Sequence, residues 1–362
     1  MVKAAVCREF GVLLSIEDIT VSAPCRGEVR VEVKACAVCH SDIMLADGAW
    51  GGELPAVYGH EAAGLVESIG DDVDTVAVGD RVVISLIRSC GRCHNCCRGF
   101  HTACTGRFAI DDREPLTTAG GENLVHGLHT GAFAEMVVID SSQVEVIPDG
   151  MAWASAALLG CGVITGVGAV TTTAEVEAGS HVVVIGCGGV GLNALQGALI
   201  AGARTLIAID LESSKREGAA EFGATHTVDG AAPDMVEQVR AITDGRGADY
   251  VFVTVGAKPA IEQAPALLAA GGAVVIVGMM PTGVSADIDT TSLADSSQRI
   301  LGSKMGSGRL AIDIPKLVAL HQQGRLKLDE LVSNTYRLDQ INEAIESARA
   351  GIARRNVVVF DD

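Results

Sequence analysis

The spacing of apolar and polar residues divides the chain into two regions with different periods. Near the N-terminus the two kinds alternate, as in Val29-Arg-Val-Glu-Val-Lys34, and proline and glycine interrupt the pattern. A period of two predicts antiparallel strands over residues 1–38. Short segments of the same kind, punctuated by glycine, return at 60–87 and 132–139. Together they predict a rolled β domain.

After Gly179 the pattern changes to short, fully apolar runs that alternate with helical segments. The runs lie at 181–185, 205–209, 248–256 and 272–278. Apolar strands separated by helices indicate a parallel sheet that is covered on both faces. The expected fold class is therefore α/β, with a doubly wound parallel sheet of the Rossmann type beside a β-rich domain.

The remaining segments carry weaker signals. Residues 105–130 are polar and rich in glycine, which predicts a long loop. A helical stretch is expected at 152–159 and a last strand at 356–360. An amphipathic helix near the C-terminus ends before Gly351. Its apolar face is formed by Ile341, Ala344, Ile345 and Ala348.

Composition narrows the class of protein. A chain of 362 residues is long enough for two domains. The net charge of -18 argues against nucleic acid as a partner, because a phosphate backbone requires a basic surface. The N-terminus does not resemble a signal peptide, and no membrane span is expected, because the apolar stretches contain charges or turn signals. Eleven cysteines in such a chain indicate metal ligands or buried thiols in the cytosol.

Four cysteines form the strongest local signal: Cys90, Cys93, Cys96 and Cys104. Two-residue gaps allow a tight turn to direct successive thiolates at one ion, and four thiolates complete a structural zinc site. An iron–sulfur cluster uses similar spacings, but the proline that follows the last cysteine of the bacterial ferredoxin motif is missing. A disulfide pair is the other alternative. Three neighbours are expected at the surface with no ligand role: Cys97, His94 and His101.

A second candidate metal site is dispersed along the chain. Cys39, His60 and Cys161 offer two sulfurs and one nitrogen, and Glu61 adds a carboxylate beside the histidine. A catalytic zinc keeps three protein ligands and one open position. The alternative for these residues is a set of buried core side chains without metal.

A glycine-rich turn lies between the strand that ends at Ile185 and a helix rich in alanine and leucine. Gly186, Gly188 and Gly191 match the spacing G-x-G-x-x-G, which brings backbone close to a pyrophosphate at a helix N-terminus. Asp210 ends the next strand, where a carboxylate binds the adenosine ribose and repels a 2′-phosphate, so NAD is expected rather than NADP. Capping of the strand end is the alternative role for Asp210.

On these motifs the chain resembles the zinc-dependent medium-chain alcohol dehydrogenases over essentially its full length. The matching segments are Cys39-His-Ser-Asp42, Gly59-His60-Glu61, the four-cysteine segment, Cys161-Gly-Val-Ile-Thr165, Gly186 to Gly191, and Asp210. Gly160-Cys-Gly-Val and Phe222-Gly-Ala-Thr-His226 are most similar to the glutathione- or mycothiol-linked formaldehyde dehydrogenase branch and its bacterial relatives.

The resemblance implies a discontinuous catalytic domain of the GroES-like type. It would comprise residues 1–162 and 304–362, with the structural zinc lobe at 90–104. The NAD-binding Rossmann domain would comprise 163–303. The resemblance also implies two zinc ions per subunit and a homodimer formed through the edge strand of the coenzyme sheet.

Roles for individual residues follow from the same resemblance. Cys39, His60 and Cys161 would bind the catalytic zinc, with Glu61 as an occasional ligand. Asp42 would accept the other ring N–H of His60. Ser41 would pass the alcohol proton toward the nicotinamide ribose. Residues expected to contact the cofactor are His40, Thr165, Gly186, Gly188, Gly189, Val190, Gly191, Asp210, Lys215, Val255, Val277, Ser303, Met305 and Arg355.

Two positions depart from the family pattern. Met44 stands where many members have a histidine that ends the proton relay, and His40 stands where some relatives have an arginine near the pyrophosphate. By analogy the substrate pocket is lined by Ser41, Trp50, Leu86, Ala103 and Met279. The small Ala103 predicts room for a bulky or aromatic alcohol, and Lys304 is a candidate for contact with an anionic substrate group.

The predicted activity is NAD-dependent oxidation of a primary alcohol, reversible as reduction of an aldehyde. Alternatives are an S-(hydroxymethyl)glutathione or mycothiol-type formaldehyde dehydrogenase, a nicotinoprotein that keeps its NAD, and a silent sensor that binds zinc and NAD. A metal-free quinone reductase is disfavoured because both sets of zinc ligands are present.

Overall fold

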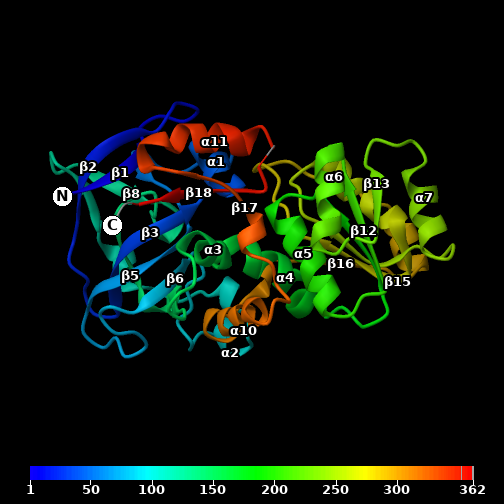
Figure 1. The fold of residues 1–362 in the computed structure, drawn as a ribbon, viewed down its shortest axis with the longest axis horizontal. Coiled ribbons are helices and arrows are strands. Elements are labelled where there is room, and N and C mark those ends of the chain that lie inside the picture. The colour runs from blue at the N-terminus through cyan, green and yellow to red at the C-terminus, as the bar shows by residue number, and fades with distance from the viewer. Residues whose placement is uncertain (352, 361–362) are drawn as a thin grey trace. The chain divides into compact units, whose positions relative to one another are not determined.

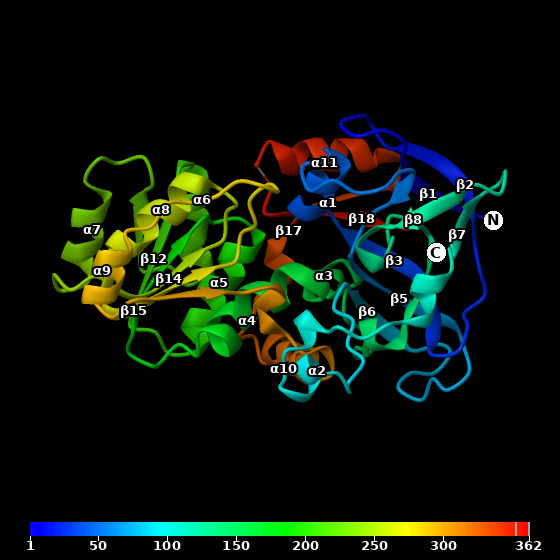
Figure 2. The same cartoon turned by 180° about the vertical axis from the view of Figure 1, so that it is seen from behind.

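The chain forms two units, which we describe one at a time in a computed structural model (Figures 1 and 2). Residues 1–351 and 353–360 are described. The first unit contains Met1–Cys161 and Arg309–Asp362, and the second contains Gly162–Gly308. A discontinuous first domain with a second domain inserted in it is the organisation that the sequence predicts.

The first unit is built from two β structures, as the alternating segments predict. One is a closed barrel with the strand order β1-β2-β7-β8-β4, and the other is a seven-stranded sheet with the order β10-β6-β5-β3-β18-β17, in which β9 also pairs with β3. The barrel strands are β1 (Val2–Cys7), β2 (Ser15–Val21), β4 (Ala56–Val57), β7 (Leu116–Thr118) and β8 (Asn123–His126). The sheet strands are β3 (Glu28–Ala37), β5 (Glu61–Ile69), β6 (Arg81–Ser85), β9 (Met136–Asp140), β10 (Val144–Val146), β17 (Val332–Tyr336) and β18 (Arg355–Val359).

The long loop predicted for residues 105–130 is wrong in part, because β7 and β8 lie within it. β7 pairs with β2 and β8 pairs with β4, so this segment closes the barrel. Strands of three and four residues are too short to show a period in the sequence. Leu116 and Leu124 are fully buried in the small barrel core, and pairing across the barrel stabilises the segment.

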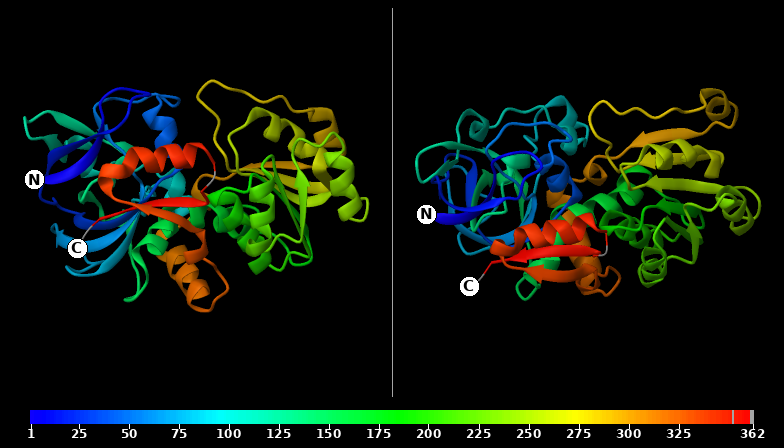
Figure 3. Two further views of the ribbon diagram at one scale, coloured as in Figure 1. Left: turned by 45° about the horizontal axis from the view of Figure 1, so that its top comes forward. Right: turned by 90° about the horizontal axis from the view of Figure 1, so that it is seen from above.

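The helices of the first unit cover its sheet. The helix α11 connects β17 to β18 in the chain, and it lies beside β18 in both views of Figure 3. In α11 the predicted face is confirmed: Ile341 and Ala344 are buried, and Ile345 and Ala348 pack against the same core. Gly351 follows the helix with φ +69°, the left-handed conformation that ends helices at glycine. The α-helices of this unit are α1 (His40–Ala46), α2 (His94–Cys97), α3 (Trp153–Leu158), α10 (Leu310–Gln322) and α11 (Ile341–Arg349).

The helical run Trp153–Thr173 carries no charged residue and has the length and composition of a membrane span. However, 83% of its apolar window is buried inside the protein, as expected for a core helix. The run begins as α3, passes through a π-helical turn at Leu159–Val163, and continues as α4 (Ile164–Gly168). The helix predicted at 152–159 is therefore the first part of a longer element.

The second unit is a six-stranded parallel sheet with the order β13-β12-β11-β14-β15-β16. The order reverses between β12 and β14, on either side of β11, which is the switch point of a doubly wound sheet. Its strands are β11 (His181–Ile185), β12 (Thr205–Asp210), β13 (His226–Asp229), β14 (Ala248–Val253), β15 (Leu268–Ile276) and β16 (Arg299–Gly302). Its other helices are α5 (Gly189–Ile200), α6 (Ser213–Ala219), α7 (Met235–Ile242), α8 (Lys258–Gln263) and α9 (Thr290–Asp295).

Helices cover both faces of this sheet. Side chains that alternate along the central strands, such as Val183 and Ile207, pack with Met235 and Val239 of α7 and with Ile261 of α8. The residues between them face the other way, toward α5, which contacts β11 and β12. Because both faces are buried, the central strands β11, β12 and β14 are mostly apolar, as their sequence indicates, while the edge strands β13 and β16 are largely exposed.

Residues 304–308 belong to the second unit, whereas the resemblance places the boundary at 303/304. Close backbone contact explains the difference. Met305, Gly306 and Ser307 all have left-handed φ angles, between +51° and +63°. A Cβ on Gly306 would lie 2.3 Å from the carbonyl oxygen of Ile164, so the turn packs directly on α4.

His126 gives the first unit a pH-dependent stability. Its ring Nε2 lies 2.6 Å from the carbonyl oxygen of Thr130, and burial lowers the pKa of His126 from 6.5 to about 4. Between these values the unfolded chain binds a proton that the folded chain excludes, so the free energy of unfolding must fall as the pH falls from 6.5 toward 4. A histidine exposed on a loop would not have this effect.

We expect His126→Gln to reduce the acid sensitivity of folding, because the amide keeps a donor for Thr130 and has no proton to gain. The loss of unfolding free energy between pH 7 and pH 5 should be smaller in the variant by about 2 kcal/mol. Urea unfolding at both pH values measures it, and the other titrating groups cancel in the difference. An equal loss in both proteins would contradict the burial argument.

Candidate active site

The N-terminus of α1 is organised by one buried carboxylate. Asp42 is 1% exposed and accepts three N–H groups. Its Oδ1 accepts from the backbone N–H of Gly59 (3.0 Å) and lies 2.9 Å from Nδ1 of His60, and its Oδ2 accepts from the backbone N–H of Cys39 (3.2 Å). Because Asp42 holds the Nδ1–H of His60, the ring presents the lone pair of Nε2 on its other side.

Three side chains meet where that lone pair points. The Nε2 of His60 lies 3.3 Å from Sγ of Cys161. The ligand atoms of Cys39, His60 and Cys161 all lie within 4.8 Å of one another. Two sulfurs and one imidazole nitrogen with a fixed tautomer are the donor set of an open zinc site, so the residues fit the metal. The pKa of Cys39 lies well below its usual value, chiefly because the thiol of Cys161 hydrogen-bonds to it.

Local backbone geometry brings Cys161 to this position. Cys161 lies in the π-helical turn Leu159–Val163, a wider turn that often occurs at functional sites. The residue before it, Gly160, lies against β6: a Cβ there would be 2.2 Å from the carbonyl oxygen of Ile84. Only glycine permits this close approach.

Glu61 and Arg355 form a buried ion pair next to the three ligands. Glu61 is fully buried and Arg355 is 7% exposed, and their side chains are joined by Nη2 of Arg355 and Oε2 of Glu61. The same nitrogen lies 3.4 Å from the carbonyl oxygen of Val38. The structure thus places Glu61 on Arg355, outside the converging group, and the guanidinium predicted to face a pyrophosphate is largely enclosed within the first unit.

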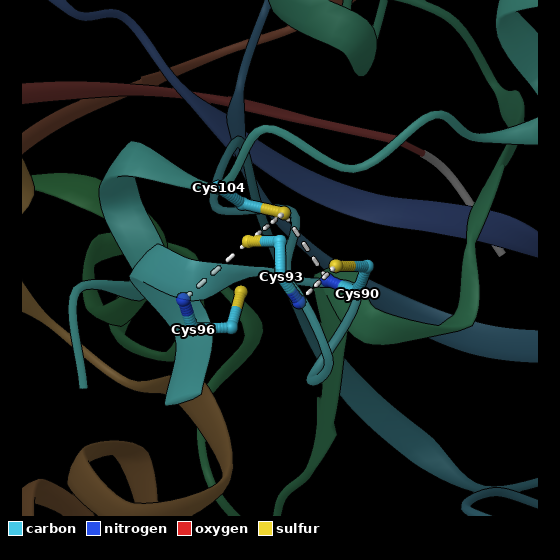
Figure 4. Close-up of side chains that lie close together, drawn as sticks. All are labelled: Cys90, Cys93, Cys96 and Cys104. Carbon is cyan, nitrogen blue, oxygen red and sulfur yellow. Dashed lines mark hydrogen bonds between the residues drawn. The ribbon is translucent and has the colours of Figure 1, made fainter. Parts of the chain in front are cut away.

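The four-cysteine segment also converges. Figure 4 shows the side chains of Cys90, Cys93, Cys96 and Cys104 turned toward one another from the turn before α2, from α2 itself and from the segment after it. Their sulfurs lie within 4.8 Å of one another. The sulfurs of Cys93 and Cys104 are 3.9 Å apart, about twice a disulfide bond length.

The chemistry of this lobe suits a structural zinc. Backbone N–H groups of Cys96 and Thr105 lower the pKa of Cys93 to about 5, which favours the thiolate that zinc binds. Cys97 is exposed, as expected, and lies outside the group. Four sulfurs leave no open position, so the lobe has the donor set of a structural zinc site, whereas the group of three donors has that of an open one.

In the second unit the glycine turn has room for a ligand at a helix N-terminus. Gly186 has φ +97°, and a Cβ on Gly191 would lie 1.8 Å from the carbonyl oxygen of Gly186, so both positions require glycine. Gly188 is the N-cap of α5, and a Cβ there would meet nothing within 4 Å. The turn therefore leaves space over the N–H groups of Gly189 and Val190, which fits a pyrophosphate.

Several predicted nicotinamide contacts gather at the carboxyl ends of the strands. Val255, Val277 and Ser303 follow β14, β15 and β16. The Oγ1 of Thr165 lies 3.6 Å from Sδ of Met305, so these two also meet. Ligands of doubly wound sheets bind at this edge.

Asp210 occupies the strand end that the sequence indicates. Its carboxylate accepts the backbone N–H groups of Cys187 (2.7 Å) and Glu212 (3.0 Å), so it also caps the strand end. These two bonds fix the carboxylate beside the glycine turn. Lys215 lies half-buried in α6, one residue before Arg216.

Comparison with known proteins matches the chain to two family descriptions. "Alcohol dehydrogenase GroES-like domain" covers residues 25–149, and "Zinc-binding dehydrogenase" covers residues 189–323. The chain is 36% identical to putative alcohol dehydrogenase D of Mycobacterium tuberculosis, over 98% of this chain and 99% of the relative. It is 37% identical to a probable S-(hydroxymethyl)glutathione dehydrogenase 1 of Schizosaccharomyces pombe, over 98% of this chain and 96% of the relative. The chain belongs to the zinc-dependent medium-chain alcohol dehydrogenases.

A solved structure supports the same assignment. The benzyl alcohol dehydrogenase of Acinetobacter calcoaceticus superimposes with a TM-score of 0.93 at 32% identity, covering 99% of each chain. The fold class predicted from the sequence is confirmed, with its GroES-like and Rossmann parts. The protein is an NAD-dependent zinc alcohol dehydrogenase, and zinc and NAD are its cofactors.

The residues predicted to line the substrate pocket of this dehydrogenase differ in how far they are exposed. Ser41, Trp50 and Leu86 are half-buried in the first unit, while Ala103 and His40 are exposed there. Met279 lies in the second unit and is 62% exposed. Met44, in place of the relay histidine, is half-buried in α1.

Sequence reasoning missed one residue that shapes the cofactor site. Thr254 follows β14, and its Oγ1 lies 3.0 Å from the carbonyl oxygen of Ile185 and 2.8 Å from that of Gly186. The hydroxyl thus supports the first glycine of the turn. In the sequence, the one sign of this role is the position of Thr254 after an apolar strand. Many threonines occur at such positions, so the sign does not single out Thr254.

We expect Asp42→Asn to weaken zinc binding at the three-ligand site by about 10- to 100-fold, because the amide removes the charge and one acceptor behind His60. Zinc in the four-cysteine lobe should be retained. Titration with a competing chelator measures both sites in one experiment.

Asp47→Asn is the matched control, because Asp47 ends the same helix but pairs with Arg349 at the surface (2.6 Å). It should leave both zinc affinities unchanged. Equal zinc affinity in the Asp42 variant and the control would contradict the positioning role.

Proposed function

We propose that this enzyme oxidises primary alcohols, including bulky and aromatic ones, to aldehydes with NAD, and catalyses the reverse reduction. The observation that supports it most is the set of three donors, Cys39, His60 and Cys161, which leaves one tetrahedral position open. Zinc held there acts as a Lewis acid that lowers the pKa of an alcohol hydroxyl.

The chain's own residues provide positioning and a path for the proton. Asp42 fixes the orientation of the His60 ring through Nδ1. NAD, when bound, would accept the hydride from the carbon that bears the hydroxyl, and the hydroxyl proton must leave separately. Ser41, next to Asp42 in α1, accepts this proton and donates its own toward the nicotinamide ribose. Because Met44 supplies no base, the proton then leaves from the ribose to water.

Cofactor binding follows the geometry of the second unit. The glycine turn and the N-terminus of α5 hold the pyrophosphate, and Asp210 accepts hydrogen bonds from the adenosine ribose. Thr165, Val277, and the Ser303 to Met305 backbone orient the nicotinamide. Arg355 contributes by holding Glu61 beside the metal ligands.

An aromatic alcohol is the preferred substrate class. The similarity to a benzyl alcohol dehydrogenase, with a TM-score of 0.93, supports it. The small side chain of Ala103 and the flat ring of Trp50 suit an aromatic group. A second candidate is the adduct of formaldehyde with a thiol, which the 37% identity to the S-(hydroxymethyl)glutathione dehydrogenase supports.

We extend the proposal to the assembly and location of the enzyme. The enzyme forms a homodimer through β16, which is an edge strand of the coenzyme sheet. It works in the cytosol, in keeping with eleven cysteines of which none forms a disulfide. Its partners are small alcohols and aldehydes.

NADH absorbance with a panel of alcohols tests the substrate class. We expect turnover with benzyl alcohol to exceed turnover with ethanol, and formaldehyde to be oxidised only slowly when glutathione or mycothiol is added. Thiol-dependent formaldehyde oxidation as the fastest reaction would select the second candidate instead.

Cys39→Ser should reduce kcat by at least about 1000-fold, because one of three metal ligands is lost, and zinc content should fall from two ions to one. Cys97→Ser is the matched control, since Cys97 is exposed and outside both metal groups. Full activity in the Cys39 variant would refute the proposed centre.

A further inference from the structure

The arginine nearest to the strand-end carboxylate is bent back on the backbone. Arg216 lies in α6, and its Nη1 donates to the carbonyl oxygens of Asp210 and Leu211, both at 2.8 Å. Its side chain is 17% exposed. A guanidinium therefore lies next to the residue that is proposed to bind the adenosine ribose, with its donors engaged by the protein.

Asp229 holds the other end of this guanidinium. The Nη2 of Arg216 lies 3.3 Å from Oδ2 of Asp229. Asp229 ends β13 and stands opposite Asp210 in the parallel register. Its Oδ1 accepts the backbone N–H of Ala231 (2.9 Å), so the carboxylate that restrains Arg216 is itself fixed.

This arrangement bears on the choice between NAD and NADP. NADP differs by a 2′-phosphate on the adenosine ribose. A carboxylate at the strand end repels that group, whereas a nearby arginine accommodates it. Guanidinium binds phosphate strongly through paired hydrogen bonds. The chain thus places both elements side by side, and the contacts of Arg216 with two carbonyl oxygens and with Asp229 hold its guanidinium on the protein.

We propose that Asp229 is a specificity-determining residue, which favours NAD by holding Arg216 on the carbonyl oxygens of Asp210 and Leu211 and away from the ribose edge. The inference rests on the proposed binding of the adenosine ribose at Asp210. Asp229 does not contact the cofactor in this account, and it acts through Arg216.

Calorimetric titration of the full-length enzyme with NAD and with NADP tests the inference. Asp229→Asn keeps the acceptor for Ala231 and removes the charge that holds Arg216. We expect NADP to bind roughly tenfold more tightly than to the unmodified enzyme, about 1.4 kcal/mol, with NAD affinity changed less than about twofold. Asp234→Asn is the matched control, because it removes an exposed charge from the same unit, and the side chain of Asp234 accepts a hydrogen bond from Gln238 (2.9 Å) rather than holding an arginine.

Loss of a negative charge at residue 229 would by itself favour a phosphate, so a second variant separates the two causes. In Asp229→Asn with Arg216→Gln the gain for NADP should disappear, because the released guanidinium is absent. A gain that survives in the double variant would overturn the inference, and so would no gain in Asp229→Asn.

The same titrations distinguish this inference from the proposed function. Asp210→Asn should weaken NAD and improve NADP if the ribose lies at Asp210. No change in that variant would show that the ribose lies elsewhere. If Asp210→Asn changes the affinities for NAD and NADP and Asp229→Asn does not, the role of Asp229 is refuted, while the ribose site at Asp210 is not.

Discussion

The buried carboxylate of Asp42 is the constraint on which the metal site depends. It accepts backbone N–H groups from Cys39 and Gly59 and the ring N–H of His60, so one side chain joins the start of α1 to the segment before β5. A buried charge is stable only when it is fully hydrogen-bonded. The three donors meet that requirement, and in doing so they fix the backbone of one metal ligand and the tautomer of another.

The second unit also contains a carboxylate that backbone N–H groups hold in place, at the proposed site of the adenosine ribose. Asp210 also accepts two backbone N–H groups, from Cys187 in the glycine turn and from Glu212. In both units a carboxylate is oriented by the main chain before any ligand binds, which reduces the ordering cost on binding. Two ion pairs extend this pattern. Glu61 holds the guanidinium of Arg355 beside the metal ligands, and Asp229 holds the guanidinium of Arg216 beside Asp210.

Local signals in the sequence predicted most of the fold and the convergence of the four cysteines, whereas the grouping of Cys39, His60 and Cys161 was implied by the family resemblance. The four-cysteine segment and the glycine turn depend on spacings within about 20 residues, so their geometry is encoded locally. The strands β7 and β8 were missed because three or four residues do not establish a period. The pairing of Glu61 with Arg355 joins residues 294 positions apart, and no local pattern reports such a contact. The turn at 305–307 packs its backbone on α4, and this contact has no signature in residue type.

Anomalous X-ray scattering at the zinc edge, from crystals of the purified enzyme, tests the central claim most directly. The account predicts two peaks per chain. One should lie among the four sulfurs of the lobe, and the other about 2.3 Å from the sulfurs of Cys39 and Cys161 and about 2.0 Å from Nε2 of His60, with Asp42 on Nδ1. A single peak in the lobe, or a second zinc bound away from these three atoms, would contradict it.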